Sequence, residues 1–442
     1  MPGDAILLRI LVLFVVSISI PSSALAISFS KLVDTTTTVP NRSSYFSHFS
    51  PPALDRDPSS GIPNAAFAAY DGGIVHNSTY TGIYAIITGN LTKIADLQTP
   101  VPGAQPFGPG NPQTFQDFGT ASISGSTVTF NGGSRGNFST PYQVGIFQGP
   151  GPLQTVANRN TLIPSGAGTF LTFVNPASSS EGEVAFVGTD GALQKGVYAR
   201  IGGTLGMVAD VATPIPGGTG FFSDFSGAAV AHATIDAQDI AFRASGSGGQ
   251  LGIYLSSSGV LSVIADKATL VPGTGSTFTS LSAPRVSDGN VAFIGANSLG
   301  GGIFIGDGTG LTTVVSYDDA VPERPGVEFN SFGNVSHDSG NVAFEAQTCA
   351  LCGGIGIYVS YRGSLIKVVD AFDTLEAKAI VGLSIGADAL SGSHLAFLAN
   401  FSDGSSGIYA ANLPEPSISS LLLVSFAAWF LGWRNARGQR RR

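Results

Sequence analysis

Residues 261–308, LSVIADKATLVPGTGSTFTSLSAPRVSDGNVAFIGANSLGGGIFIGDG, decide the fold because the chain repeats their pattern seven times. An apolar strand ends in a polar residue, and a proline follows six residues later. A pair of large apolar residues, most often F-x-x-F, comes next. A strand containing A-F or a close variant and a strand reading G-x-Y or G-x-F complete the unit. Self-similarity at a nearly fixed period indicates a repeat architecture.

The residue that closes the apolar strand aligns the seven units. It is Asp34, Asp96, Asn158, Asp210, Asp266, Ser316 and Asp370, so successive units lie 50 to 62 residues apart. Proline follows in six units, and Glu376 takes its place in the seventh. The later strands carry Phe67, Phe130, Phe186, Phe242, Phe293, Phe344 and Phe397, and then Tyr84, Phe147, Tyr198, Tyr254, Phe304, Tyr358 and Tyr409.

Each unit reads as four short strands joined by turns, which predicts antiparallel hairpins. We name them A (the F-x-x-F pair), B (A-F), C (G-x-Y) and D (the apolar strand). Such a sheet buries both faces only when it is stacked between neighbours around an axis. The chain begins with an unpaired strand D near residues 27–34 and ends with an unpaired A–C, and pairing the two completes a ring. We therefore predict an all-β, seven-bladed propeller of four-stranded antiparallel blades over residues 27–412, closed by the N-terminal strand; an open β-solenoid is the alternative.

The order D–A–B–C, with an IAF-like strand B and an IYV-like strand C, resembles the repeats of TolB-like and WD40-like propellers. The likeness covers residues 27–411 at the level of the strand pattern. It implies the same blade architecture.

Both ends of the chain read as targeting segments. Residues 6–20 are apolar, and Ala24-Leu25-Ala26 has the small residues of a signal-peptide cleavage site, so we expect residues 1–26 to be removed. An uncleaved anchor is the alternative.

The tail from 413 to 442 holds Pro414-Glu415-Pro416, an apolar stretch at 417–433 long enough for a short membrane helix, and five arginines. This order resembles the PEP-CTERM sorting signal. The resemblance implies export through the inner membrane, processing by an exosortase and delivery to the cell surface or extracellular matrix. A plain tail anchor is the alternative.

Removing residues 1–26 and 417–442 lowers the net charge from −8 to −13, because residues 417–442 carry five arginines while Asp4 and Arg9 cancel. An acidic chain repels phosphate backbones, which excludes nucleic acid as an expected partner. Charged residues make up only 11% of the chain and no metal-binding or cofactor motif stands out, so no metal or cofactor is predicted.

Three motifs carry possible chemistry. Cys349 and Cys352 lie in one predicted B–C loop, and an exported chain favours a local disulfide over metal-binding or redox thiols. Residues 382–386 match G-x-S-x-G but fall on a predicted strand rather than a nucleophile elbow. The aspartates that close strand D favour a turn role over a ligand ring.

The residue before the second aromatic of strand A is polar in most units. If strand A is innermost, His48, Asp117 and Asp224 gather at the central channel, where they could hold a cation or polar ligand; a solvated channel mouth is the alternative.

We interpret the chain as a non-catalytic binding or structural component of the surface or matrix, with exopolysaccharide or other surface proteins as partners. An extracellular lyase or hydrolase using the channel and a lectin are the alternatives, and no catalytic residue is assigned.

Overall fold

The computed structural model describes residues 26–55, 63–72, 80–135, 142–164, 166–192, 194–225, 233–348 and 354–414. The strands all belong to one compact unit, Ser28–Leu413. Within the described ranges every regular element is a strand, and none of them holds a helix that could cross a membrane.

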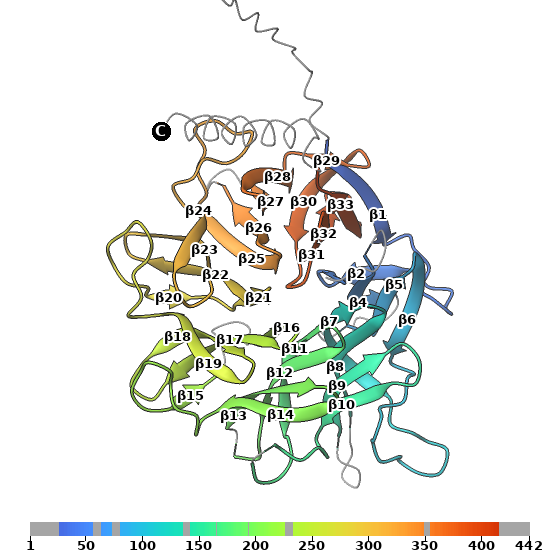
Figure 1. The fold of residues 1–442 in the computed structure, drawn as a ribbon. Helices are drawn as coiled ribbons and strands as arrows, with labels where there is room; N and C mark the ends of the chain where they lie inside the picture. Colours follow the sequence, from blue (N-terminus) through green and yellow to red (C-terminus); the bar gives the residue numbers. More distant parts are fainter. Residues whose placement is uncertain are drawn as a thin grey trace, which may run out of the picture. The chain divides into compact units, whose positions relative to one another are not determined.

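Seven antiparallel sheets are arranged around an axis, so the seven-bladed propeller prediction is confirmed (Figure 1). Blade 1 holds β2 (Phe46–Phe49), β3 (Ala53–Leu54), β4 (Ala65–Asp71), β5 (Gly82–Ile87) and β6 (Asn90–Asp96). Blade 2 holds β7 (Phe115–Ser124), β8 (Thr127–Ser134), β9 (Val144–Gly149) and β10 (Gln154–Asn158). Blade 3 holds β11 (Thr172–Ser180), β12 (Glu183–Thr189), β13 (Lys195–Ile201) and β14 (Thr204–Asp210).

The remaining four blades follow the same order. Blade 4 holds β15 (Phe222–Asp224), β16 (Ala233–Asp236), β17 (Asp239–Gly246), β18 (Leu251–Ser257) and β19 (Val260–Asp266). Blade 5 holds β20 (Ser280–Leu281), β21 (Arg285–Ser287), β22 (Asn290–Asn297), β23 (Gly300–Gly306) and β24 (Leu311–Ser316). Blade 6 holds β25 (Ser331–Asp338), β26 (Asn341–Gln347), β27 (Ile355–Tyr361) and β28 (Ser364–Asp370). Blade 7 holds β29 (Thr374–Leu375), β30 (Lys378–Ser384), β31 (Leu390–Ser391), β32 (His394–Phe401), β33 (Ser406–Asn412) and β1 (Ser28–Asp34).

The ring closes between the two ends of the described chain. Strand β1 pairs antiparallel with β33, from Ser28 opposite Asn412 to Asp34 opposite Gly407. The first strand therefore supplies the outer strand that blade 7 lacks, as the sequence predicted.

Strand A is bent, which the sequence did not predict. In blades 1, 4, 5 and 7 it is split into two segments, and in blades 2, 3 and 6 a register shift interrupts its pairing with strand B. Pro51, Pro52 and Pro284 lie in two of these gaps, where proline's missing donor costs no ladder bond. The first half of the strand carries the F-x-x-F pair, and the second half faces the neighbouring blades.

Four large side chains form the core of a typical blade. In blade 1, Phe46, Phe49, Phe67 and Tyr84 are all buried, and the ring centroids of five of their six pairs lie 4.9 to 6.1 Å apart. Such aromatic faces pack on the aliphatic face of the preceding blade, as Phe293 of blade 5 packs in one cluster with Ile253 and Leu255 of blade 4. Each blade therefore depends on its neighbours for burial of its hydrophobic surface.

The glycine of G-x-Y is required by this core. The ring of Tyr84 folds back over Gly82, where an added Cβ would lie 2.8 Å from the hydroxyl oxygen. Gly252 beneath Tyr254 has the same close approach of 2.8 Å. Any larger residue would displace the core aromatic ring.

Candidate functional site

Hydrogen bonds between the inner strands of neighbouring blades run around the axis of the propeller; we call them the axial seam. At each step from blade 1 to blade 7, a side-chain oxygen near the end of one inner strand accepts a backbone N–H of the next blade. The acceptor–donor pairs are Asp55–Gly125 (2.9 Å), Ser122–Ser179 (3.1 Å), Ser180–Ala237 (3.2 Å), Asp236–Asp288 (2.8 Å), Ser287–Ser339 (3.0 Å) and Asp338–Gly392 (2.6 Å). At the step from blade 7 to blade 1, the Leu54 N–H donates to the backbone oxygen of Asp388 at 2.6 Å.

Charged groups on this axis are buried in the same seam. Arg285 is 6% exposed, and its Nε donates to Val335 O of blade 6 at 3.0 Å. Asp388 is 5% exposed, and its Oδ2 accepts the hydroxyl of Ser122 at 3.1 Å. A buried polar group needs such partners, so we assign these residues to blade-to-blade adhesion.

Sequence reasoning missed this seam although a signal was present. Strand A ends in, or in blade 1 is directly followed by, serine or aspartate in every unit: Asp55, Ser124, Ser180, Asp236, Ser287, Asp338 and Ser391. The pattern was hidden because the bend in strand A separates these residues from the aromatic anchors by a variable number of positions.

The three predicted channel residues lie on the first halves of strands A in blades 1, 2 and 4. His48 is exposed, and its ring lies edge-on to Tyr70 at 5.9 Å. Asp224 forms an ion pair of 2.9 Å with Lys195 of blade 3. The Asp117 side chain is exposed on one side, while neighbouring protein atoms partly desolvate its carboxyl group. This desolvation raises the pKa of the carboxyl, although a hydrogen bond from Gly133 N–H and the charge of Arg135 act to lower it.

Within the described ranges, no three His, Cys, Asp or Glu side chains are placed to hold a metal ion. His48, Asp117 and Asp224 therefore do not form a metal triad there. Their role toward a polar ligand stays a prediction.

The strand-closing aspartates occupy turns. Asp266 Oδ1 accepts the N–H of Ala268 at 2.9 Å and the hydroxyl of Thr269 at 2.8 Å, and Asp210 bonds Ala212 and Thr213 in the same way. Asn158 substitutes for aspartate in this turn without change of pattern.

The remaining sequence motifs divide between described and undescribed residues. Ser384 of the G-x-S-x-G stretch lies on strand β30, and its hydroxyl donates to Glu345 Oε1 at 2.8 Å. The predicted disulfide pair Cys349 and Cys352 and the signal peptide lie outside the described residues, as does the sorting tail after Pro414.

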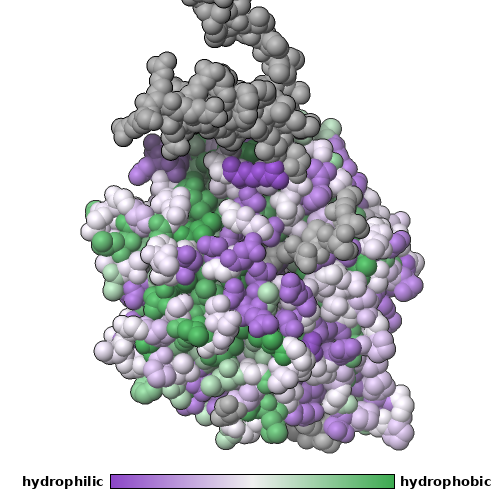
Figure 2. All heavy atoms as spheres, in the orientation of Figure 1, coloured by the Kyte–Doolittle hydropathy of each residue, from purple (hydrophilic) through white to green (hydrophobic). Residues whose placement is uncertain are grey.

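One face of the propeller exposes large apolar side chains. Because neighbouring strands of a blade are antiparallel, the B–C hairpins and the connections between blades emerge at the same end of every blade; we call this end the connection face. Among the residues that the structure describes, twelve large hydrophobic side chains are exposed, and eight of them lie on this face. They are Tyr45, Phe107, Tyr142, Leu162, Phe221, Leu270, Leu299 and Phe372. Figure 2 shows hydrophobic side chains gathered over blades 4 and 5 on the side of the molecule in view.

In three adjacent blades, 6, 7 and 1, charged side chains form ion pairs at the connection face. In blade 1, Arg42 pairs with Asp71 and, at 3.1 Å, with Asp96, which also binds Lys93 at 3.0 Å. In blade 6, Lys367 pairs with Glu323 and Asp373 at 3.1 Å each. These side chains fill the space between strands C and D and the connection that leads into the blade.

Blade 7 has the same arrangement at the ring closure. Lys31 lies 2.9 Å from Asp34 and 3.1 Å from Glu376. Burial alone would raise the pKa of Asp34, but hydrogen bonds from Lys31, Thr36 and Thr37 outweigh it and lower the pKa to about 2.

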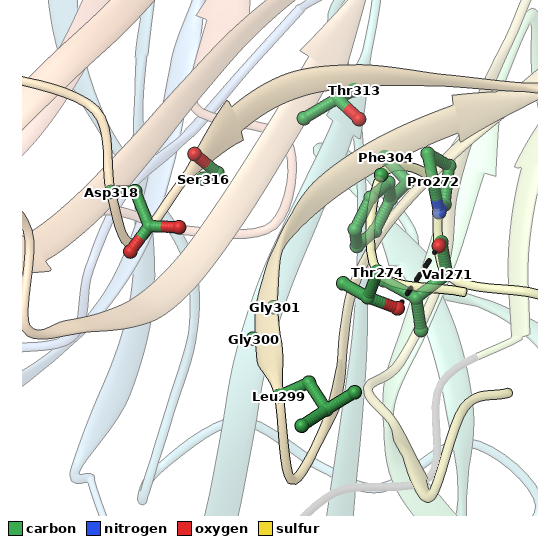
Figure 3. Close-up of a pocket in the computed structure, with 11 residues that line it drawn as sticks. Val271, Pro272, Thr274, Leu299, Gly300, Gly301, Phe304, Thr313, Ser316 and Asp318 are labelled. Atoms are coloured by element: carbon green, nitrogen blue, oxygen red, sulfur yellow. Dashed lines mark hydrogen bonds between the residues drawn. The ribbon is translucent and has the colours of Figure 1, made fainter. Parts of the chain in front are cut away.

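Blade 5 has a pocket in the equivalent place. Its volume is about 430 Å³, and it is bounded by residues 271–274, residues 299–301, Phe304, Thr313, Ser316 and Asp318. Figure 3 shows Ser316 and Asp318 on one side of the pocket and Val271, Pro272 and Thr274 on the other. Counting from the strand closers, Thr274, Thr313 and Ser316 stand where blade 1 has Arg42, Lys93 and Asp96. In this pocket, short neutral side chains therefore stand where blade 1 has its ionic cluster.

Comparison with known proteins places the chain in a family. The sequence model of a family of unknown function, DUF7453, matches residues 22–193 and 108–369. The chain belongs to this family. The two matches overlap, as expected when a chain is built of repeats. No curated protein matches the sequence.

Several solved structures are similar in fold. The β-propeller domain of the Trilobed protease from Pyrococcus furiosus, described as having an open velcro topology, is 11% identical, with 84% of this chain and 94% of that chain covered and a TM-score of 0.44. A puromycin-hydrolysing peptidase of Mycobacterium tuberculosis is 12% identical, with 79% and 50% covered and a TM-score of 0.41; this chain thus spans half of that peptidase. A chain of the mitotic checkpoint complex is 14% identical, with 86% and 95% covered and a TM-score of 0.35.

Proposed function

We propose that this protein is an exported, non-catalytic propeller that binds extracellular polysaccharide through its connection face. The observation that carries the proposal is the concentration of exposed large apolar side chains on that one face. Exposed apolar patches on soluble domains usually mark interaction sites. Five of the eight side chains are aromatic: Tyr45, Phe107, Tyr142, Phe221 and Phe372. Aromatic rings offer flat apolar surfaces to the C–H faces of sugars.

Two of these rings are supported by arginine. The guanidinium of Arg159 lies 4.3 Å from the ring centre of Tyr142, and that of Arg324 lies 3.9 Å from the ring centre of Phe372. Cation–π contacts of this kind hold an exposed ring in one orientation. A prearranged ring loses less conformational entropy when a ligand binds.

Binding is tested by co-sedimentation of the exported protein with the extracellular matrix of its host. The variant Tyr45→Ser/Leu162→Ser/Phe221→Ser removes three exposed side chains that do not line the blade 5 pocket, and we expect it to lose at least tenfold in affinity. Val260→Ser is the matched control, because Val260 is 71% exposed on a C–D hairpin at the opposite end of its blade. Equal retention of all three proteins would refute the binding face, and retention by a protein fraction instead of polysaccharide would refute the ligand class.

Export and surface delivery rest on the signal peptide and the PEP-CTERM-like tail of the sequence. We propose cleavage after Ala26, exosortase processing near Pro414-Glu415-Pro416, and a local disulfide between Cys349 and Cys352. Mass spectrometry of the exported protein under non-reducing conditions measures all three. Retention of residues 1–26, an intact tail in a host with active exosortase, or a mass corresponding to two free thiols would each contradict the matching part.

A further inference from the structure

The pocket of blade 5 leaves polar groups open to a ligand. The side chains of Thr313, Ser316 and Asp318 form no hydrogen bond with any residue in the described part of the chain. By contrast, the hydroxyl of Thr274 is engaged, donating to Val271 O at 3.2 Å and accepting from Asn297 Nδ2 at 3.0 Å. Two hydroxyls and one carboxylate therefore face the pocket with free hydrogen-bonding capacity.

The opposite wall is apolar. Val271, Pro272, Leu299 and Phe304 contribute to the lining, and Leu299 is 65% exposed at the rim. The pocket volume of about 430 Å³ falls within the range of about 300–1,000 Å³ that is usual for small-molecule sites. The ligand that fits such walls has both hydroxyl groups and an apolar face.

Charge narrows the ligand class further. No lysine or arginine lines the pocket, and the only charged group there is the Asp318 carboxylate. An anionic sugar would find no counter-ion and would meet this carboxylate in a chain whose net charge is already −8. A carboxylate can accept two hydroxyl donors at once, and such charge-assisted hydrogen bonds are stronger than neutral ones.

We propose that the blade 5 pocket is a binding site for one or two neutral sugar residues. Asp318 accepts hydrogen bonds from adjacent hydroxyls, Thr313 and Ser316 complete the polar contacts, and Pro272 and Leu299 cover the apolar face of the sugar ring. This inference rests on the proposed function, because it names the subsite at which the connection face would recognise its polysaccharide.

The test uses small sugars rather than polymer, so that it is separate from the matrix experiment. The exported protein is titrated with a panel of neutral mono- and disaccharides, with glucosamine as a cationic and glucuronate as an anionic comparison, and binding is followed by NMR shifts and calorimetry. We expect at least one neutral sugar to bind and the anionic sugar to fail. Asp318→Ala should weaken binding about tenfold.

A second variant fills the pocket with the side chains that blade 1 already uses. Thr274→Arg/Thr313→Lys/Ser316→Asp adds two positive charges and one negative charge, and Asp318 supplies the fourth partner. This variant should abolish sugar binding without lowering the melting temperature. Thr312→Lys is the control, because it adds a charge one residue away, where alternation along the strand turns the side chain from the pocket.

The outcomes separate the two proposals. Loss of neutral-sugar binding in the filled variant but not in Thr312→Lys supports the pocket. No neutral-sugar binding by the unmodified protein, equal binding by the filled variant, or binding of glucosamine alone overturns it. If matrix retention persists while small sugars fail to bind, the pocket inference is wrong and the proposed function stands; if matrix retention also fails, the proposed function is wrong.

Discussion

Blades 1 and 5 share one core but differ at the connection face. Phe67 and Phe293 occupy the same place in strand B, and both are fully buried. At the rim, Asp96 of blade 1 is 1% exposed between two cations, whereas Ser316 of blade 5 opens onto a pocket. The comparison divides each repeat into two parts. The buried aromatic core, with Phe67 or Phe293, is required by the architecture, whereas the side chains at the connection face, such as Asp96 or Ser316, can differ without altering the fold; we call the first the shared layer and the second the rim.

The largest expected effect tests the shared layer. Phe67→Ala and Phe293→Ala should each lower the free energy of unfolding by about 3–5 kcal/mol, because both remove a fully buried ring from a packed aromatic cluster. Denaturant unfolding of both variants measures the costs. A difference of more than about 2 kcal/mol between them would mean that the two cores are not equivalent.

The next effect tests the rim. Asp96→Ser should lower the free energy of unfolding by about 2 kcal/mol, because Arg42 and Lys93 lose a buried partner and the turn loses an acceptor.

The reciprocal Ser316→Asp should lower the free energy of unfolding by about 1 kcal/mol, since blade 5 offers the new carboxylate no cation. Adding Thr274→Arg to Ser316→Asp should recover that loss, which a double-mutant cycle measures as a favourable coupling. Additive costs would show that blade 5 cannot accommodate the cluster of blade 1.

The shared layer was predictable from the sequence, and the rim was not. The same residue types recur at the core positions of every blade because the packing there allows few substitutions. The ring of Tyr84, for example, fits only over a glycine, which Gly82 provides. Blade number and ring closure followed from these anchors. At the pocket, residues 274, 313 and 316 lack the charges of their blade 1 counterparts, and a missing charge is visible only once the repeats are aligned at the rim.

Two further features escaped prediction for geometric reasons. The bend in strand A, marked by Pro284 in blade 5, moved the inner-strand residues away from the aromatic positions that guided the alignment. His48, Asp117 and Asp224 were assigned to the channel on the condition that strand A is innermost, and they lie on the first half of that strand. The axial seam at Ser287 and Asp338 lies instead on the second half of that strand.

A smaller effect concerns pH. Burial would raise the pKa of Asp96, but hydrogen bonds from Lys93, Thr99 and Arg42 outweigh it and the pKa lies below its usual value. A lowered folded-state pKa contributes stability that is complete above the unfolded value of about 3.9 and is lost as pH falls through the folded value.

Lys93→Met should therefore flatten the loss of stability as the pH falls below about 4, because Asp96 loses one of the hydrogen bonds that lower its pKa. Thr313→Met at the matching position of blade 5 should leave the pH dependence unchanged, because Ser316 does not titrate. Urea unfolding at several pH values provides both measurements. An equal flattening in the two variants would show that the titration of Asp96 is not the cause.

The smallest effect is expected from exchanging the strand C aromatics. Strand C carries tyrosine in the five blades that close with aspartate and phenylalanine in the two that close with Asn158 or Ser316. Tyr84 is buried, burial and the charges of Asp71 and Asp96 raise the pKa of its phenol, and its hydroxyl has no hydrogen-bond partner in the described residues. Removing an unsatisfied hydroxyl is nearly neutral, so Tyr84→Phe should change the free energy of unfolding by less than about 0.5 kcal/mol.

The reverse exchange, Phe304→Tyr, should matter for binding rather than for stability. Phe304 lines the pocket near Ser316, so the added hydroxyl would take up space that the sugar needs and would offer Ser316 a competing partner. We expect about tenfold weaker binding of neutral sugars with an unchanged melting temperature. Phe147→Tyr in blade 2 is the matched control, since Phe147 lies opposite Thr155 and does not line this pocket, so the exchange should leave sugar binding intact. Equal weakening by both variants would trace the loss to the blade core and would remove the distinction between core and rim.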